Sequence, residues 1–155
     1  MKHKNESGFT LVELLVTITI IGILAAVSIP FFQEYKLRSQ MTALTTEFKS
    51  IEVAILAYYQ DHNAYPVDRN PGILPPGFGD FISQDFFNRT PIGGVYDYEG
   101  PPAWPVAGVS VRNSPYGNGA PEWTTLDSML DDGDTSTGQF RFTRGWYVYV
   151  VDGNP

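Results

Sequence analysis

The feature that most constrains this chain is a run of 19 uncharged residues from Leu14 to Phe32, with the sequence LLVTITIIGILAAVSIPFF. As an α-helix the run is about 28 Å long, close to the thickness of about 30 Å of a bilayer's hydrocarbon core. The basic residues Lys2 and Lys4 precede it. Because basic flanks stay on the cytoplasmic side, the sequence predicts a single-pass membrane protein with a cytoplasmic N-terminus and an exported C-terminal part.

A cleavable secretory signal is the alternative interpretation of a basic start followed by an apolar run. Such a signal has an apolar region of about 7–15 residues that ends at a small-x-small site, whereas this run is longer and continues into further helical sequence. A membrane anchor therefore fits better. Glu13 lies directly before the run, in otherwise apolar sequence. An unpaired carboxylate costs about 3 kcal/mol at mid-bilayer, so Glu13 requires either a charged partner or a position at the lipid headgroups.

Residues 8–15 read Gly-Phe-Thr-Leu-Val-Glu-Leu-Leu. This run resembles the cleavage and methylation motif of type IV pilins and of the related pseudopilins of type II secretion. The short basic leader, the position of Glu13 and the presence of Pro30 in the apolar helix follow the same pattern. The resemblance is strong over residues 1–36 and weak afterwards.

The resemblance implies that a prepilin peptidase cuts the chain between Gly8 and Phe9 on the cytoplasmic side and methylates the new N-terminal Phe9. It implies that the chain first resides in the lipid bilayer of the bacterial inner membrane. There an assembly platform of a pilus or secretion system would polymerise copies of the chain into a periplasmic or extracellular filament. Glu13 is then an assembly residue, because its carboxylate would attract the Phe9 amine of a neighbouring subunit in a low dielectric.

The helical pattern does not end with the apolar run. Apolar residues recur at steps of four and three, at Leu37, Met41, Leu44, Phe48, Ile51, Ile55 and Tyr58. Asn63 followed by Pro66 marks the end of the pattern. The sequence therefore predicts one long helix from about Phe9 to His62, with an apolar first half and an amphipathic second half.

Gly22 and Pro30 lie inside the expected helix. Glycine is flexible, and Pro30 lacks the N–H that would bond to the carbonyl of Ala26. We therefore expect a kink or a melted turn near residues 22–30. The alternative is that both residues are simply tolerated, because both are relatively frequent in membrane helices.

The apolar stripe of the second half has two interpretations. It is either the seam of a coiled-coil dimer or a face that packs on the chain's own C-terminal domain. Three heptads followed by a Gly/Pro-rich segment favour the second. The opposite face carries polar residues that we expect to be free for solvent or neighbouring subunits, among them Arg38, Glu47, Lys49 and Glu52.

Beyond Pro66 the sequence predicts short elements separated by Gly and Pro. These are a one-turn helix around residues 78–82, strands at 95–98 and 106–112, a helix from residue 121 to Gly133, and a hairpin of strands 139–143 and 146–152. The expected fold class is α+β, with the long helix packed on a small antiparallel sheet whose strand order stays open. This fold is similar to that of the pilin family.

The predicted elements divide the chain into three parts. Residues 1–8 form the cytoplasmic leader, and residues 9–35 form the transmembrane and assembly helix. Residues 36–155 form an extracytoplasmic, pilin-like globular domain that includes the second half of the long helix.

Composition excludes several function classes. The chain has no Cys, so it holds no disulfide and no thiol nucleophile. Its net charge of -7 argues against nucleic acid as a partner, because phosphate binding requires clustered Lys and Arg. Motifs of serine hydrolases, P-loop proteins and zinc proteases are absent from the sequence. We therefore predict a protein that is not an enzyme, with no catalytic residues and no cofactor.

One acidic run offers candidate metal ligands. Asp131, Asp132 and Asp134 surround Gly133 and offer oxygen ligands. The run D-D-G-D lacks the spaced acidic residues and the bidentate Glu of a calcium-binding loop. We therefore predict no metal site, and calcium binding by this run is the alternative.

Together these features predict a structural subunit of a type IV pilus-like or pseudopilus filament that polymerises through its N-terminal helix. The alternatives are a type II secretion pseudopilin, or a minor pilin with an adhesive or DNA-uptake role. A monomeric membrane-anchored domain is a third possibility, but it leaves Glu13 unexplained.

Overall fold

A computed structural model describes residues 8–152 of the chain. The predicted leader therefore lies outside the described residues, apart from Gly8. The chain divides into two compact units, one up to Arg38 and one from Ser39 onward. Helix α1 (Leu11–His62) contributes to both units.

Helix α1 confirms the long helix expected from the sequence, since its bounds lie within two residues of the predicted ones. It continues without interruption through Gly22 and Pro30. The expected melted turn is therefore not present. The φ angle of proline is close to the helical value, so Pro30 removes one hydrogen bond without forcing the helix to end. A bend at these two positions stays a prediction.

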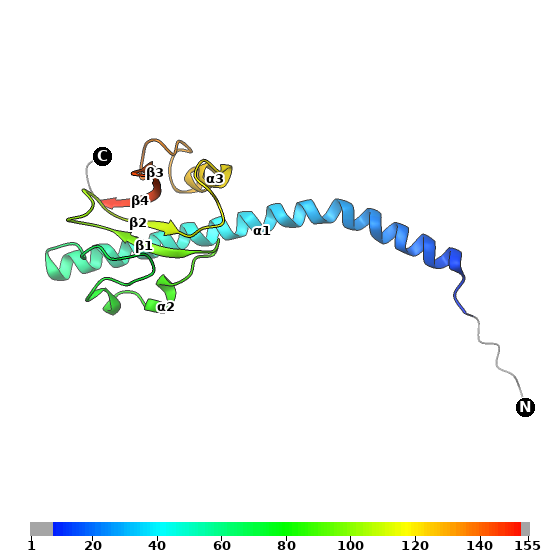
Figure 1. Cartoon of the computed structure of the whole chain (residues 1–155), viewed down its shortest axis with the longest axis horizontal. Coiled ribbons are helices and arrows are strands. Elements are labelled where there is room, and N and C mark those ends of the chain that lie inside the picture. Colours follow the sequence, from blue (N-terminus) through cyan, green and yellow to red (C-terminus); the bar gives the residue numbers. More distant parts are fainter. Residues whose placement is uncertain (1–7, 153–155) are drawn as a thin grey trace, which may run out of the picture. The chain divides into compact units, whose positions relative to one another are not determined.

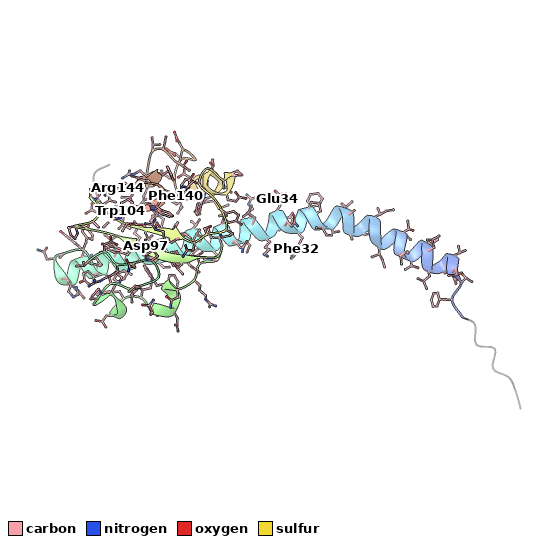
Figure 2. The ribbon with its side chains drawn as sticks, in the orientation of Figure 1. Phe32, Glu34, Asp97, Trp104, Phe140 and Arg144 are labelled. Carbon is pink, nitrogen blue, oxygen red and sulfur yellow. The ribbon has the colours of Figure 1, made fainter. Side chains whose placement is uncertain are left out.

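The N-terminal part of α1 exposes its apolar side chains on all sides. Between Gly8 and Lys36 no side chain is buried, and Leu11 and Phe32 are 89% and 70% exposed. Figure 2 shows Phe32 projecting from this part of the helix. Among the described residues, α1 is the one helix that is long and apolar enough to cross a membrane.

Four antiparallel strands form the sheet of the second unit. They are β1 (Val95–Glu99), β2 (Ala107–Arg112), β3 (Phe140–Thr143) and β4 (Trp146–Asp152), in the order β1-β2-β4-β3. The predicted strands are confirmed to within one residue at each end. The structure adds the strand order, because β4 pairs with β3 on one side and with β2 on the other. Figure 1 shows the sheet along the C-terminal half of α1.

The core lies between this half of α1 and one face of the sheet. The helix contributes buried apolar residues, which are Met41, Leu44, Phe48, Ile51, Ala54 and Ile55. Phe48 stacks on Tyr149 with ring centroids 5.4 Å apart, and it also contacts the rings of Tyr96 and Phe140. The stripe therefore packs on its own domain, as the sequence predicted.

The expectation that the opposite helix face would be free was wrong for three polar residues. Glu47 accepts a hydrogen bond from the Tyr96 hydroxyl at 2.5 Å, and Glu52 accepts one from the Tyr149 hydroxyl at 2.8 Å. Lys49 donates to that same Tyr149 hydroxyl. A buried tyrosine ring carries a hydroxyl that needs a partner, and long side chains at the edge of the stripe can reach it.

Short helices lie beside the sheet. The predicted one-turn helix is a 3-10 turn (Phe78–Asp80), whose buried Phe78 contacts the Tyr58 ring with centroids 5.9 Å apart. Helix α3 (Pro121–Leu130) packs against β3, as Figure 1 shows. Helix α2 (Gln84–Phe87), which packs against β1, was not predicted, and the hydroxyl of Ser83 caps its N-terminus.

Two local features, the turn between β3 and β4 and the C-terminal end of α1, have the geometry that their residue types favour. The β3–β4 hairpin turns at Arg144 and Gly145, whose φ angles of 51° and 91° are those of a type I′ turn. At the end of α1, Nδ1 of His62 lies 3.0 Å from the carbonyl oxygen of Tyr58. The histidine side chain thus contacts a carbonyl oxygen near the C-terminal end of the helix.

Candidate assembly site at the N-terminus of the long helix

Thr10 and Glu13 form a reciprocal capping box at the start of α1. The backbone N–H and the hydroxyl of Thr10 both donate to Oε2 of Glu13, each at 2.9 Å. In return, the backbone N–H of Glu13 donates to the Thr10 hydroxyl at 3.2 Å. The sequence T-L-V-E fits the capping-box pattern, a signal that our sequence analysis did not use.

The capping box fixes where the Glu13 carboxylate lies. It is held at the positive end of the helix dipole, against the backbone amide of the residue that follows Phe9. Among the described residues, the Glu13 carboxylate accepts hydrogen bonds from Thr10 alone. Within one chain, the cap therefore supplies the partner that this carboxylate requires.

Gly8 and Phe9 precede the helix in an exposed, non-helical segment. The Phe9 side chain is 85% exposed. A Cβ atom added at Gly8 would have no neighbour within 4 Å, so packing within the chain does not require a glycine there. The predicted cleavage junction is thus accessible. A Cβ atom at Gly22 is equally unobstructed.

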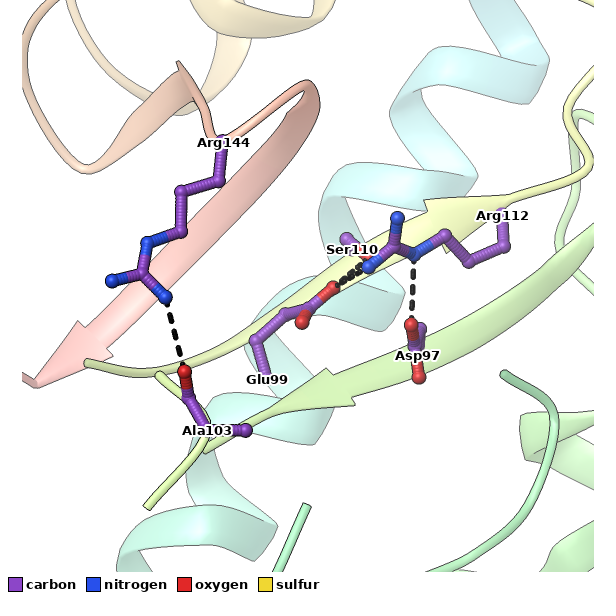
Figure 3. A network of polar contacts seen from close by, with 6 residues as sticks. All are labelled: Asp97, Glu99, Ala103, Ser110, Arg112 and Arg144. Atoms are coloured by element: carbon purple, nitrogen blue, oxygen red, sulfur yellow. Dashed lines mark hydrogen bonds and ion pairs between the residues drawn. The ribbon is translucent and has the colours of Figure 1, made fainter. Parts of the chain in front are cut away.

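A second polar cluster lies on the sheet face that points away from α1. Nε of Arg112 donates to Asp97 at 2.7 Å, and Nη2 of Arg112 donates to Glu99 at 2.5 Å. The Ser110 hydroxyl also donates to Glu99, at 2.7 Å (Figure 3). All four side chains are buried. They join β1 to β2 beneath Trp146, whose ring lies 3.7 Å from the Arg112 guanidinium.

Two carboxylates share one guanidinium in this cluster. Oδ1 of Asp97 has no hydrogen-bond partner. Burial and the charge of Glu99 raise the pKa of Asp97 to about 7, although Arg112 opposes both effects. Burial also raises the pKa of Glu99. Sequence reasoning missed the cluster because polar residues at every second strand position normally indicate a solvent-exposed face.

In the folded chain, two of the three aspartates after α3 lie close to the helix and the third does not. Asp131 and Asp132 lie close to Asp127 of α3. Asp134 turns away, because its Oδ1 accepts hydrogen bonds from the backbone N–H and the hydroxyl of Ser136.

Comparisons with known proteins agree with the N-terminal site. The family described as the prokaryotic N-terminal methylation motif matches residues 3–29. Fimbrial protein EcpC of Eikenella corrodens is 43% identical over 96 residues, which cover 61% of this chain and 63% of that protein. Type IV major pilin protein PilE1 of Neisseria gonorrhoeae is 37% identical over 71 residues, which cover 46% of this chain and 33% of that protein.

This chain spans about a third of the length of the Neisseria relative and less than two thirds of the length of the Eikenella relative. The solved structure of the major type IV pilin PilA1 from Clostridium difficile is similar with a TM-score of 0.49 and 16% identity, covering 74% of this chain and 96% of that one. By name, the two relatives are a fimbrial protein and a type IV major pilin protein, neither of which is the name of an enzyme.

Proposed function

We propose that this chain is a structural subunit of a type IV pilus-like filament, because it matches the prokaryotic N-terminal methylation motif and is similar to type IV pilins. In this proposal a prepilin peptidase removes residues 1–8 and methylates Phe9. An inner-membrane assembly platform then polymerises the mature chain through α1. One observation carries the proposal, namely the exposed apolar N-terminal part of α1 with a carboxylate in its first turn, directly after an accessible Gly-Phe junction.

The exposed helix supports self-association. Apolar surface transferred out of water gains about 25 cal/mol per Å², so these side chains require an apolar environment. A bilayer supplies it before assembly. A bundle of identical helices supplies it afterwards, so that moving from one to the other costs little hydrophobic energy. The subunit would therefore begin as a single-pass protein of the inner membrane, with its N-terminus cytoplasmic, and end in a periplasmic or extracellular filament.

The capping box supports a specific role for Glu13. In the single chain its carboxylate accepts two hydrogen bonds from Thr10. Cleavage after Gly8 would place a positive amine on Phe9, and hydrogen bonds between charged groups are stronger than those from a neutral amide or hydroxyl. We infer that the Phe9 amine of a neighbouring subunit displaces donors of Thr10 during assembly.

The chief alternative is a pseudopilin of type II secretion, which would use the same processing and the same helix. The relatives named above are pilus and fimbrial proteins, which favours the pilus. A DNA-binding minor pilin would need a basic surface, which a net charge of -7 does not favour.

Processing is tested by co-expressing the full chain with a prepilin peptidase and measuring the mature mass. We expect a chain that begins with methylated Phe9. Gly8→Val should remain uncut, because a side chain obstructs the peptidase. Gly117→Val is the matched control, since a Cβ atom there also meets nothing within 4 Å, and it should be cut normally. A mature chain that begins at another residue would refute the proposed processing.

A further inference from the structure

Two tyrosine rings stack where α1 ends. The ring centroids of Tyr59 and Tyr65 lie 4.5 Å apart, and the ring planes differ by 28°. Tyr59 lies in the last turn of α1, and Tyr65 follows shortly after the helix. Between residues 8 and 152, every other aromatic contact of a tyrosine ring is to Phe, Trp or His. Within the described part of the chain, two phenols therefore meet in this place alone.

The C-terminal cap of α1 brings the two rings together. The backbone N–H of Asn63 donates to the carbonyl oxygen of Tyr59 at 2.8 Å, and Asn63 has a φ angle of 51°. A left-handed residue that follows a helix and bonds back to its last turn is a common helix stop. A contact between the residues beyond this stop and the last turn often accompanies it. Local sequence therefore places Tyr65 against Tyr59.

The Tyr65 hydroxyl has a carboxylate as its partner. It donates to Oδ2 of Asp152, the last residue of β4. Burial raises the pKa of Tyr65, and the hydrogen bond to Asp152 and the negative charge of Asp152 raise it further. The phenol of Tyr65 therefore stays protonated at neutral pH. Its proton is directed at a group that can accept it when the ring loses an electron.

Tyr59 is the member of the pair that solution reaches more readily. Its side chain is 39% exposed, whereas Tyr65 is half-buried. A dissolved oxidant can therefore contact Tyr59 directly. The stacked ring of Tyr65 lies close enough for the oxidation to spread to it.

We propose that Tyr59 and Tyr65 form a dityrosine crosslink when the chain meets a one-electron oxidant, such as a haem peroxidase supplied with hydrogen peroxide. Each phenol gives one electron to the oxidant and one proton to an acceptor. The proton of Tyr65 goes to Asp152, and the proton of Tyr59 goes to water.

The two phenoxyl radicals then couple. One ortho carbon of each ring forms the new carbon–carbon bond, and the hydrogen on each of these carbons moves through solvent to the phenol oxygen. The chain loses two electrons and two protons in total. Hydrogen peroxide takes up both as it is reduced to water, so the reaction is balanced.

The stacked geometry favours coupling within one chain over coupling between chains. Two groups that are held in contact react as though each were very concentrated around the other. Tyr35 provides the comparison, because it is 72% exposed and has no aromatic ring contact among those found between residues 8 and 152. A radical on Tyr35 would have to meet a second chain.

The crosslink would close the C-terminal end of α1 covalently. The chain has no Cys, so a disulfide cannot serve this purpose. Because Tyr65 also bonds to Asp152, the crosslinked helix end would stay joined to the end of β4. Tyr59, Tyr65 and Asp152 all belong to the unit that begins at Ser39. The inference therefore does not depend on the proposed filament function.

The crosslink is tested by treating the full chain, dilute in detergent micelles, with a haem peroxidase and hydrogen peroxide. We expect a monomeric product that shows dityrosine fluorescence and has lost the mass of two hydrogen atoms. Proteolytic digestion and tandem mass spectrometry should place the new bond between Tyr59 and Tyr65. Tyr59→Phe and Tyr65→Phe keep the stacked ring but remove one phenol, so each should abolish the fluorescence of the monomer.

Tyr35→Phe is the matched control, because it removes an exposed phenol from the same helix without touching the pair. It should crosslink as the wild type does. Asp152→Asn should slow the coupling, because an amide does not take up the proton of Tyr65. An unchanged rate in that variant would overturn the proton transfer to Asp152.

Circular dichroism establishes that each variant is folded. The proposal is overturned when dityrosine appears in covalent dimers alone, or when the bond joins other tyrosines. It is equally overturned when Tyr59→Phe or Tyr65→Phe still gives a fluorescent monomer.

Discussion

The backbone amide of Thr10 donates to the carboxylate of Glu13 at 2.9 Å, so the side chain proposed to direct assembly also caps the helix in the single chain. The carboxylate therefore has a partner before any neighbouring subunit arrives. This lowers the cost of holding a charge near the membrane edge, and it gives the incoming amine a carboxylate that is already oriented. In the proposed assembly, the Phe9 amine of a neighbouring subunit would replace hydrogen-bond donors of Thr10 around this one side chain.

Glu13→Gln separates the two roles of this residue. Glutamine can still complete a capping box, but it carries no charge for the Phe9 amine. We expect membrane insertion and cleavage to persist while the variant is absent from sheared filament fractions measured by immunoblot. Glu13→Ala should behave in the same way. Glu122→Gln, in the first turn of α3, is the control and should assemble normally. Normal amounts of Glu13→Gln in filaments would disprove the ion-pair role.

The Asp97 cluster predicts that stability decreases as the pH rises. The pKa of Asp97 is about 7 in the folded chain and near 3.8 when the chain is unfolded, so the folded state binds the proton more tightly. The free energy of unfolding should therefore fall between about pH 4 and pH 7, by about 1.4 kcal/mol for each unit of pKa difference. Melting temperatures measured from pH 4.5 to 8 provide the test.

Asp97→Asn is the variant that assigns this pH dependence. It removes the titrating group and should flatten the curve, although Glu99 retains a slope of the same sign because its pKa is also raised. An unchanged curve in Asp97→Asn would mean that other groups cause the pH dependence.

Phe48 and Phe32 provide matched substitutions on the same helix. Phe48 is fully buried against three aromatic rings, whereas Phe32 is 70% exposed. Phe48→Ala should lower the free energy of unfolding of the globular unit by about 3–5 kcal/mol, because it leaves a cavity in the core. Phe32→Ala should leave that value within about 0.5 kcal/mol. Equal effects of the two substitutions on thermal unfolding would contradict the assigned core.

A chain that begins at Lys36 should be soluble and folded. The buried residues of α1 begin at Met41, and the compact second unit begins at Ser39. Such a chain lacks the exposed apolar helix that requires lipid. Size-exclusion chromatography should show a monomer, and circular dichroism should show a cooperative thermal transition. An aggregated or unfolded product would show that the globular unit depends on the preceding helix.

Much of the fold could be predicted because it rests on local patterns. The three- and four-residue spacing of apolar side chains defined α1, and Arg144-Gly145 between two alternating strands indicated the hairpin. Strand order depends on contacts distant in sequence, such as the pairing of Val109 with Tyr149, and no local pattern encodes it.

The candidate site residues also divide into those that a local pattern reveals and those that only the fold reveals. Gly8, Phe9 and Glu13 belong to one continuous run, residues 8–15, whose motif could be recognised from the sequence. The Arg112 cluster and Asp127 could not be recognised, because a polar residue on a strand or short helix has the same local pattern whether it is solvated or buried. Only the folded chain shows that these side chains are enclosed.

The position of β4 has a consequence for the timing of folding. It is the last strand in sequence, yet it lies between β2 and β3 and pairs with both of them. Residues 95–112 leave the ribosome well before residues 146–152, so the first two strands can pair but the sheet cannot close until the late segment arrives. Non-local pairing of this kind is slow. An unfinished chain therefore lacks the Tyr149 ring that stacks on Phe48, and this exposed aromatic surface distinguishes it from a finished chain.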